Sequence, residues 1–175
     1  MNNMFKTVIS ILIMMVLWNE SSVVEGKDRI STEQPISVEK AYELMGYTDF
    51  DNALKQYNKK GLILPSDVPF KVEYQYAKVD SESSSINFEY LGENFSRNHL
   101  SIKVSPKSNP DYKNNLLMIS GEKAWMIEAT RPEFPTIISF KKNDGYYTVM
   151  LHMGIKPLER AALIQIAEEL IHENG

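Results

Sequence analysis

The sequence predicts an α+β fold, in which a twisted, mostly antiparallel sheet of about six to seven strands has short N-terminal helices and a C-terminal helix packed on one face. Two observations predict this class. Apolar residues recur with a helical period before residue 62 and again after residue 156, whereas they alternate with polar residues between residues 71 and 153. The length of 175 residues and the 43% hydrophobic content suit one domain, which we place at residues 36–175.

The first 26 residues have the form of a signal peptide. One lysine, Lys6, precedes an uncharged apolar run from Val8 to Trp18, and a polar segment follows the run. This run is shorter than the roughly 18 to 20 apolar residues of a membrane-spanning helix. We therefore expect cleavage after Gly26 and a polar tether at residues 27–35, with an uncleaved membrane anchor as the alternative.

A first short helix is predicted within "SVEKAYELMG". Ser37 precedes it as the N-cap, because a serine hydroxyl accepts a hydrogen bond from the free backbone N–H groups of the first turn. Gly46 can take the left-handed conformation that ends a helix. The residues expected on the apolar face of this helix are Val38, Ala41, Leu44 and Met45.

A second short helix is predicted within "DFDNALKQYNKKG". Asp49 or Asp51 caps its start, and Leu54 and Tyr57 supply apolar contacts. The lysines near its end interact favourably with the negative end of the helix dipole. Gly61 is expected to end it.

Seven strands are predicted after the proline-containing stretch "LILPSDVPF". In the first of them Val72, Tyr74 and Tyr76 share one face, which is typical of a half-buried antiparallel strand. Short turns such as Asn143-Asp144-Gly145 indicate that most neighbours in the chain form hairpins. The predicted strands span residues 71–79, 86–92, 99–105, 116–121, 123–130, 136–142 and 145–153.

The segment "KPLERAALIQIAEELIHENG" predicts a C-terminal helix. Pro157 suits the first turn of a helix, and Glu159 is favourable near its positive end. The helix has an apolar stripe that we expect to cover one face of the sheet. This stripe consists of Leu163, Ile166, Ala167, Leu170 and Ile171.

Composition and charge exclude several functional classes. The formal net charge is -4, and lysines and arginines are scattered among acids, so we expect no nucleic-acid partner. The chain has no cysteine, which excludes a disulfide, a thiolate nucleophile and a cysteine-based metal site. An exported protein without cysteine suits the outside of a bacterium. The sequence has none of the histidine-pair, calcium-loop or phosphate-binding glycine motifs, so we expect no metal and no cofactor.

The strongest candidate site residue is His152, in the last predicted strand. Its side chain shares one face with Tyr146, Thr148 and Met150, whereas the alternate residues Tyr147, Val149, Leu151 and Met153 form the apolar face that the C-terminal helix covers. The simplest interpretation of the first face is a solvated sheet surface. The alternative is a surface that binds a peptide, a lipid headgroup or a neighbouring protein. His99 is expected at an edge or turn, and His172 at the end of the helix.

Glu128 and Trp125 are the other residues that stand out. Glu128 is the only acid in a strongly apolar strand, and an ion pair near the Arg131–Glu133 turn explains it more simply than acid–base catalysis does. We nevertheless include Glu128 with the possible binding face. Trp125 is expected in the core, because a large aromatic residue in mid-strand usually packs under a helix.

Several motifs together resemble a bacterial extracytoplasmic domain family of unknown function. They are "ISVEKAYELMGY", "LILPSDVPFKVEYQYAKV", "GEKAWMI", "GYYTVML" and "ERAALIQIAEELI", and they span about residues 36 to 172. Members of this family occur alone or attached to anti-sigma-factor-like and lipoprotein-carrier-like proteins of Gram-positive bacteria. The resemblance implies a non-enzymatic module of the cell envelope and carries no catalytic residues.

We therefore expect a non-catalytic exported domain, secreted or anchored to the membrane by its N-terminal segment. It would bind or sense a protein, a peptide or a component of the cell envelope. One alternative is an inhibitor or immunity-type protein that acts on a partner through the exposed strand face or the 106–115 loop. A further alternative is a hydrolase that uses Glu128 and His152.

Overall fold

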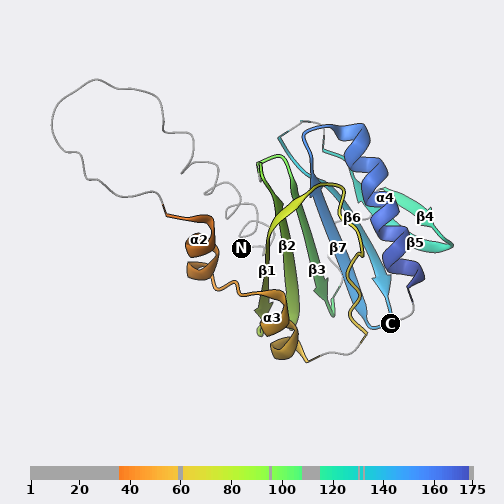
Figure 1. The fold of residues 1–175 in the computed structure, drawn as a ribbon. Helices are drawn as coiled ribbons and strands as arrows, with labels where there is room; N and C mark the ends of the chain where they lie inside the picture. Colours follow the sequence, from red (N-terminus) through yellow and green to blue (C-terminus); the bar gives the residue numbers. More distant parts are fainter. Residues whose placement is uncertain are drawn as a thin grey trace, which may run out of the picture. The chain divides into compact units, whose positions relative to one another are not determined.

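The structure is a computed structural model that describes residues 36–58, 61–94, 96–107, 115–129, 131 and 133–173. The predicted signal peptide and tether lie outside these residues. Three described helices, α2 (Val38–Leu44), α3 (Phe50–Tyr57) and α4 (Lys156–His172), flank the sheet (Figure 1). None of them is long and apolar enough to cross a membrane. The strands are β1 (Val72–Asp80), β2 (Ser85–Gly92), β3 (His99–Ser105), β4 (Leu116–Ile119), β5 (Glu122–Ile127), β6 (Thr136–Lys142) and β7 (Gly145–His152).

The predicted α+β class is confirmed, because these strands form one antiparallel sheet with α4 packed on one face. The strand order is β1-β2-β3-β7-β6-β5-β4. Strands β1 to β3 form one meander, strands β4 to β7 form a second, and the pairing of β3 with β7 joins the two. The sheet edges within the described residues are therefore β1 and β4.

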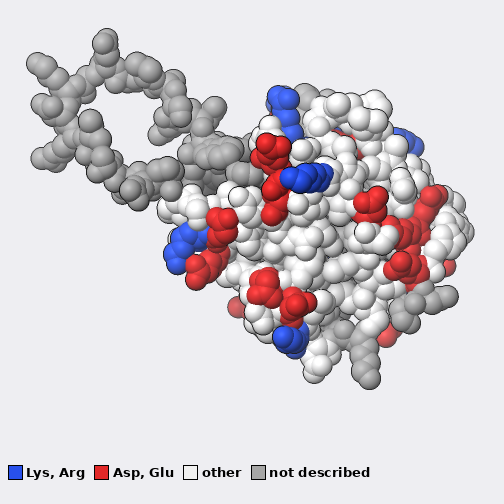
Figure 2. Space-filling model, in the orientation of Figure 1, with Lys and Arg blue, Asp and Glu red and all other residues white. Residues whose placement is uncertain are grey.

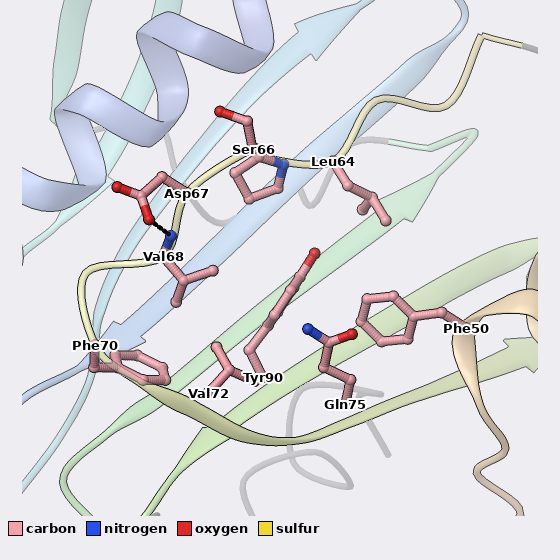
Figure 3. A pocket seen from close by; sticks show the side chains of 10 residues that line it. Phe50, Leu64, Ser66, Asp67, Val68, Phe70, Val72, Gln75 and Tyr90 are labelled. Atoms are coloured by element: carbon pink, nitrogen blue, oxygen red, sulfur yellow. Dashed lines mark hydrogen bonds between the residues drawn. The ribbon is translucent and has the colours of Figure 1, made fainter.

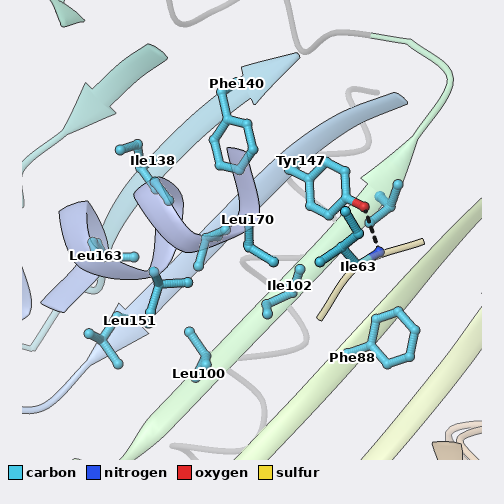
Figure 4. Packing of buried hydrophobic residues seen from close by; sticks show 14 of the residues in the cluster. Ile63, Phe88, Leu100, Ile102, Ile138, Phe140, Tyr147, Leu151, Leu163 and Leu170 are labelled. Carbon is cyan, nitrogen blue, oxygen red and sulfur yellow. Dashed lines mark hydrogen bonds between the residues drawn. The ribbon is translucent and has the colours of Figure 1, made fainter. Parts of the chain in front are cut away.

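One face of the sheet forms the core beneath α4. Antiparallel partners place Phe88, Ile102, Val149 and Ile138 in one row across the sheet, and each of these side chains is 0% exposed. Burying a large apolar side chain contributes roughly 1.5–3 kcal/mol. Figure 4 shows side chains of this face packing around Leu163 and Leu170 of α4. The predicted apolar stripe of the helix is thus confirmed for its buried members.

The predicted caps of the two short helices are present. The Ser37 hydroxyl accepts a hydrogen bond from Lys40 N at 3.3 Å, and Asp49 Oδ1 accepts one from Asn52 N at 2.9 Å. Gly46 has a φ of +81° after α2, as predicted. The expectation that Gly61 ends the second helix is wrong, because α3 ends at Tyr57 and Asn58 takes the left-handed conformation.

The apolar face predicted for α2 is confirmed for Val38, Ala41 and Met45, which are half-buried, and is wrong for Leu44. Tyr42 is 6% exposed, whereas Leu44 is 68% exposed. The reason lies in tertiary packing: the Tyr42 ring stacks on the Tyr76 ring of β1 with a centroid distance of 4.5 Å and meets the Tyr47 ring edge-on at 5.0 Å. Because Tyr76 projects from the sheet face opposite α4, α2 covers that face near β1.

The register of β1 explains this position of Tyr76. The pairing with β2 is irregular between Val72 and Tyr74, and Ala77 pairs with Phe88 on the core face. Tyr74 and Tyr76 therefore lie on the opposite face, and their rings stack with centroids 6.3 Å apart. A bulge reverses which residues of a strand point inward, and alternation in the sequence does not reveal it.

The segment between α3 and β1 runs across the α4 side of the sheet. Ile63 N donates a hydrogen bond to the Tyr147 hydroxyl at 3.1 Å, and Ser66 N donates one to Glu169 Oε1 of α4. Ile63 is buried in the same core cluster as the helices. The segment thereby fills the space between α3 and α4 (Figure 1).

Candidate binding face of the sheet

The candidate site is the part of the sheet opposite α4 that spans β3, β7, β6, β5 and β4, which we call the distal face. It consists of every second residue of these strands. Its members are His99, Ser101, Lys103 and Ser105 of β3, Tyr146, Thr148, Met150 and His152 of β7, Ile137, Ser139 and Lys141 of β6, Lys123, Trp125 and Ile127 of β5, and Leu116 and Met118 of β4.

The structure places four of the five predicted site residues on the distal face. Tyr146, Thr148, Met150 and His152 are half-buried, whereas Tyr147, Val149 and Leu151 between them are buried in the core. The predicted division of β7 into a core face and a second face is confirmed. Tyr146, Thr148 and Met150 therefore lie where a partner could reach them from one side of the sheet. The side chain of His152 is 13% exposed and lies close to Glu159 at the start of α4.

Glu128 does not belong to this group. It follows β5 two residues after the buried Met126, so its side chain points to the α4 side, where it forms an ion pair with Arg160. No hydrogen bond or ion pair of the described residues joins Glu128 to His152. The expected structural ion pair is present, but its partner comes from α4 rather than from the 131–133 turn.

A buried carboxylate, Glu89 of β2, organises the polar end of the distal face. It is 6% exposed, and its Oε2 lies 2.5 Å from His99 Nε2. The other oxygen, Oε1, accepts hydrogen bonds from the Tyr47 hydroxyl at 3.2 Å, Asn87 Nδ2 at 2.5 Å and Ser101 Oγ at 3.3 Å. A buried carboxylate is tolerated only when it is paired in this way.

His99 is thus part of a network, and the expectation of an edge or turn position is wrong. His99 begins β3, an interior strand between β2 and β7. Sequence reasoning missed the network because its members come from three separate segments. The available signal was that polar residues alternate with apolar ones in both β2 and β3, so that Glu89 and Ser101 become direct cross-strand partners.

Burial and the nearby Glu89 charge raise the pKa of the Tyr47 hydroxyl. Tyr47 therefore stays neutral and can donate its proton to the carboxylate. Burial likewise raises the pKa of Tyr42, which stacks on the sheet beside it. The chemistry of this end of the face is that of a fixed polar network that ties the segment after α2 to β2.

His152 lies directly across from His99 in the β3–β7 pairing, and its side chain is 13% exposed. Its Nδ1 lies 3.5 Å from Glu159 Oε1 but is a buried atom without a hydrogen-bond partner among the described residues. Burial lowers the pKa of His152, and the charge of Glu159 opposes this effect, while Lys156 and His99 also lower the pKa. His152 is therefore neutral at neutral pH.

Glu159 itself is 0% exposed and fastens the start of α4 to the end of β7. Its Oε1 accepts hydrogen bonds from Met153 N at 2.8 Å and Gly154 N at 3.0 Å, and its Oε2 accepts from Thr136 Oγ1 at 2.9 Å and Lys156 Nζ at 2.7 Å. Burial alone would raise the pKa of Glu159, but these donors outweigh it and lower the pKa. The sequence indicated only that an acid suits the first turn.

The apolar part of the distal face lies towards the edge strand. Trp125 pairs with Leu116 of β4 and with Ser139 of β6, and it is half-buried. The expectation that Trp125 fills the core is wrong, because its neighbours Ala124 and Met126 take the core positions. Leu116 and Met118 are 52% and 63% exposed, which makes this end of the face the most accessible apolar part.

A hollow lies on the α4 side of the sheet, between α3 and the segment that precedes β1. It has a volume of about 380 Å³ and apolar walls that include Phe50, Leu64 and Phe70 (Figure 3). Gln75 and Tyr90 lie at its floor, and burial together with the charge of Glu169 raises the pKa of Tyr90 to about 12. The proline-containing stretch before β1 gave no indication of this hollow in the sequence.

His172 is the last residue of α4, as predicted. Among the described residues no group of three histidine or acidic side chains could hold a metal ion. Comparison with known proteins gave no match: no family model, no curated protein and no solved structure resembles the chain significantly.

Proposed function

We propose that the protein is a non-catalytic binding domain, exported from the cell, and that it binds a protein, a peptide or a component of the cell envelope through the distal face. The observation that carries the proposal is the exposure of Leu116 and Met118, which lie beside Trp125 on an edge strand. Exposed apolar side chains that cluster on one face are typical of interaction surfaces.

The core that packs behind the distal face supports this role. Every strand that contributes to it also contributes buried side chains to the core beneath α4. The exposed side chains are therefore presented on a rigid platform, which lowers the entropy lost on binding. The acid and histidine in closest contact, Glu89 and His99, are occupied by a hydrogen-bond network, which favours binding over catalysis.

The proposed export rests on the sequence of the first 26 residues. Expression of the full chain in a Gram-positive host, followed by fractionation and intact mass, tests it. A protein that begins at Lys27 in the medium indicates a secreted binder, and a protein that keeps Met1 in the membrane fraction indicates an anchored one. An unprocessed protein in the cytoplasm contradicts export.

Site-specific photo-crosslinking tests the binding face. A photoreactive amino acid is placed at Met118 in the full chain and, as a control, at Leu158, which is 52% exposed on α4. We expect a discrete adduct with an envelope fraction from position 118 and none from position 158. Equal labelling from both positions contradicts the proposal. If the crosslinked partner is an enzyme and the protein inhibits it, the role is that of an inhibitor or immunity-type protein.

A further inference from the structure

The charged side chains of the distal face are all positive. Lys103, Lys123 and Lys141 are its exposed charged residues, and β3, β7, β6, β5 and β4 place no acidic side chain on it. The whole chain, in contrast, has a net charge of -4. On the α4 side, which Figure 2 shows, acidic side chains are widespread and basic ones are few. The side chains of these five strands therefore make the distal face basic, whereas the side that carries α4 is mainly acidic.

These lysines also differ from others of the described chain in forming no ion pair, although the charge of Lys103 acts on Asp80. Lys40, Lys71 and Lys156 form ion pairs with Glu43, Glu73 and Glu159 at 2.8, 2.6 and 2.7 Å. Lys103, Lys123 and Lys141 make no ion pair with a described residue. Ala124 pairs with Phe140, and one step further along this register brings Lys123 opposite Lys141. Like charges in such cross-strand positions are destabilising, so an anionic ligand would relieve the repulsion.

The charged residues adjoin the apolar end of the face. Met118 pairs with Lys123, and Leu116 pairs with Trp125, so lysine and apolar side chains alternate across β4 and β5. The outer edge of β4 has no strand partner among the described residues, and its four residues, "LLMI", carry neither charge nor proline. The other edge strand, β1, has a bridge between Thr48 and Ala77 and several charged side chains. Within the part of the chain that the structure describes, the β4 edge thus lacks the protection found at β1.

We infer that the distal face, as the binding face proposed above, takes an acidic polypeptide segment with apolar side chains, which docks across β4, β5 and β6. Acidic side chains of the segment neutralise Lys123 and Lys141, and its apolar side chains cover Leu116, Met118 and Trp125. Where the segment continues past β4, its main chain can pair with the free edge of that strand, as in β-strand addition. A lipid surface could not use that edge, and three lysines are fewer than the four to eight of a typical anionic-lipid site.

Trp125 is the built-in reporter of this site, because the chain has two tryptophans and Trp18 lies in the N-terminal segment. The test uses the full chain with Trp18→Phe. An eight-residue peptide that alternates glutamate with valine is titrated against Trp125 fluorescence, and a lysine–valine peptide is the control ligand. We expect saturable binding of the acidic peptide alone, weakened several-fold between 50 and 300 mM salt because exposed charges are screened. Equal binding of both peptides, or of neither, overturns the inference.

A pair of double variants identifies the lysines. Lys123→Gln with Lys141→Gln removes two charges from the distal face, and Lys40→Gln with Lys71→Gln removes two charges from lysines elsewhere. We expect at least tenfold weaker peptide binding for the first variant and a change below twofold for the second. Circular dichroism and thermal melting establish that both variants are folded. Equal affinity of the two double variants overturns the inference.

Two outcomes separate this inference from the proposed function. A specific crosslink from Met118 without any binding of acidic peptide leaves the binding face standing and overturns the acidic partner. Binding to phosphatidylglycerol vesicles that depends on Lys123 and Lys141, without peptide binding, likewise overturns the peptide and assigns the charges to a membrane surface. Peptide binding that depends on these lysines supports the inference, even if the envelope fraction yields no adduct.

Discussion

At the scale of single residues, buried carboxylates do more to organise this molecule than the histidines that are conspicuous in the sequence. Glu89 and Glu159 are 6% and 0% exposed, and each is surrounded by hydrogen-bond donors. Sequence reasoning identified His152 because one histidine among apolar residues is noticeable. It could not identify the acids as buried, because the donors come from distant parts of the chain.

Replacement of Glu159 by glutamine should destabilise the fold. In the Glu159→Gln variant the amide NH2 group replaces one carboxylate oxygen, and it faces hydroxyl or N–H groups that are themselves donors. Buried hydrogen bonds at Thr136 or at the end of β7 are therefore lost. We expect a decrease of about 3 kcal/mol in the free energy of unfolding, measured by urea denaturation. Glu168→Gln, at an exposed position of the same helix, is the matched control and should change stability by less than about 0.5 kcal/mol.

The stability of the protein should fall on mild acidification, in part through His152. The folded state lowers the pKa of His152 below its ordinary 6.5, so the unfolded state binds the proton more readily. The contribution of neutral His152 to the free energy of unfolding is fully present above pH 6.5 and is lost as the pH falls through the folded-state pKa. We expect the His152→Gln variant to lose less unfolding free energy than the native chain between pH 7.5 and 5.5.

Denaturation at a series of pH values measures this difference. His172→Gln provides the control, because it removes a histidine from the exposed end of α4, away from Glu159. Its pH dependence should follow that of the native protein over the same interval. Parallel curves for all three proteins would show that His152 is not responsible for the acid sensitivity.

At the scale of elements, local signals in the sequence located helices and strands and the buried faces of α4 and β7, but they did not identify the residue that α2 buries most deeply. Ser37 and Asp49 cap the helices as predicted, since a cap depends on residues within one turn. The buried face of α2 depends instead on Tyr76, 34 positions along the chain from Tyr42, and on the irregular register of β1. Propensity and periodicity contain no information about such a partner.

The corrected orientation of α2 leads to a prediction about its packing. Tyr42→Ala removes the ring that stacks on Tyr76, so we expect a loss of about 2–4 kcal/mol in the free energy of unfolding. Leu44→Ala, two residues away and 68% exposed, should cost less than about 0.5 kcal/mol. Urea denaturation of the two variants decides between this face and the one expected from sequence, for which the order of the two losses would be reversed.

At the scale of the whole molecule, the class and the seven strands followed from the sequence, whereas the strand order did not. Alternation of apolar and polar residues marks each strand, and short turns indicate hairpins. The pairing of β3 with β7 joins residues about 45 positions apart, and no local signal selects β7 over β4 as the neighbour of β3. The lysines of the distal face come together only through this order.

Hydrogen exchange should reveal the hierarchy of the sheet. Strands β3 and β7 lie in its interior and carry the 0%-exposed Ile102 and Val149, so their amides should open only on global unfolding. Strands β1 and β4 lie at the edges and should exchange faster. Mass spectrometry of proteolytic fragments after deuteration measures these rates. Slower exchange in β4 than in β7 would contradict this order.

Because the sheet divides at the β3–β7 pairing, the polypeptide can be cut into two fragments that each keep one meander. Each meander is continuous in sequence, and the chain passes from one to the other only once, between β3 and β4. A break placed in that connection would leave each fragment with complete hairpins. It would also expose β3 on one fragment and β7 on the other, and the fragments would reassociate when these two strands pair again. The protein is accordingly suited to fragment complementation, with α4 on one piece and the segment of Ile63 and Ser66, which packs beside α4, on the other.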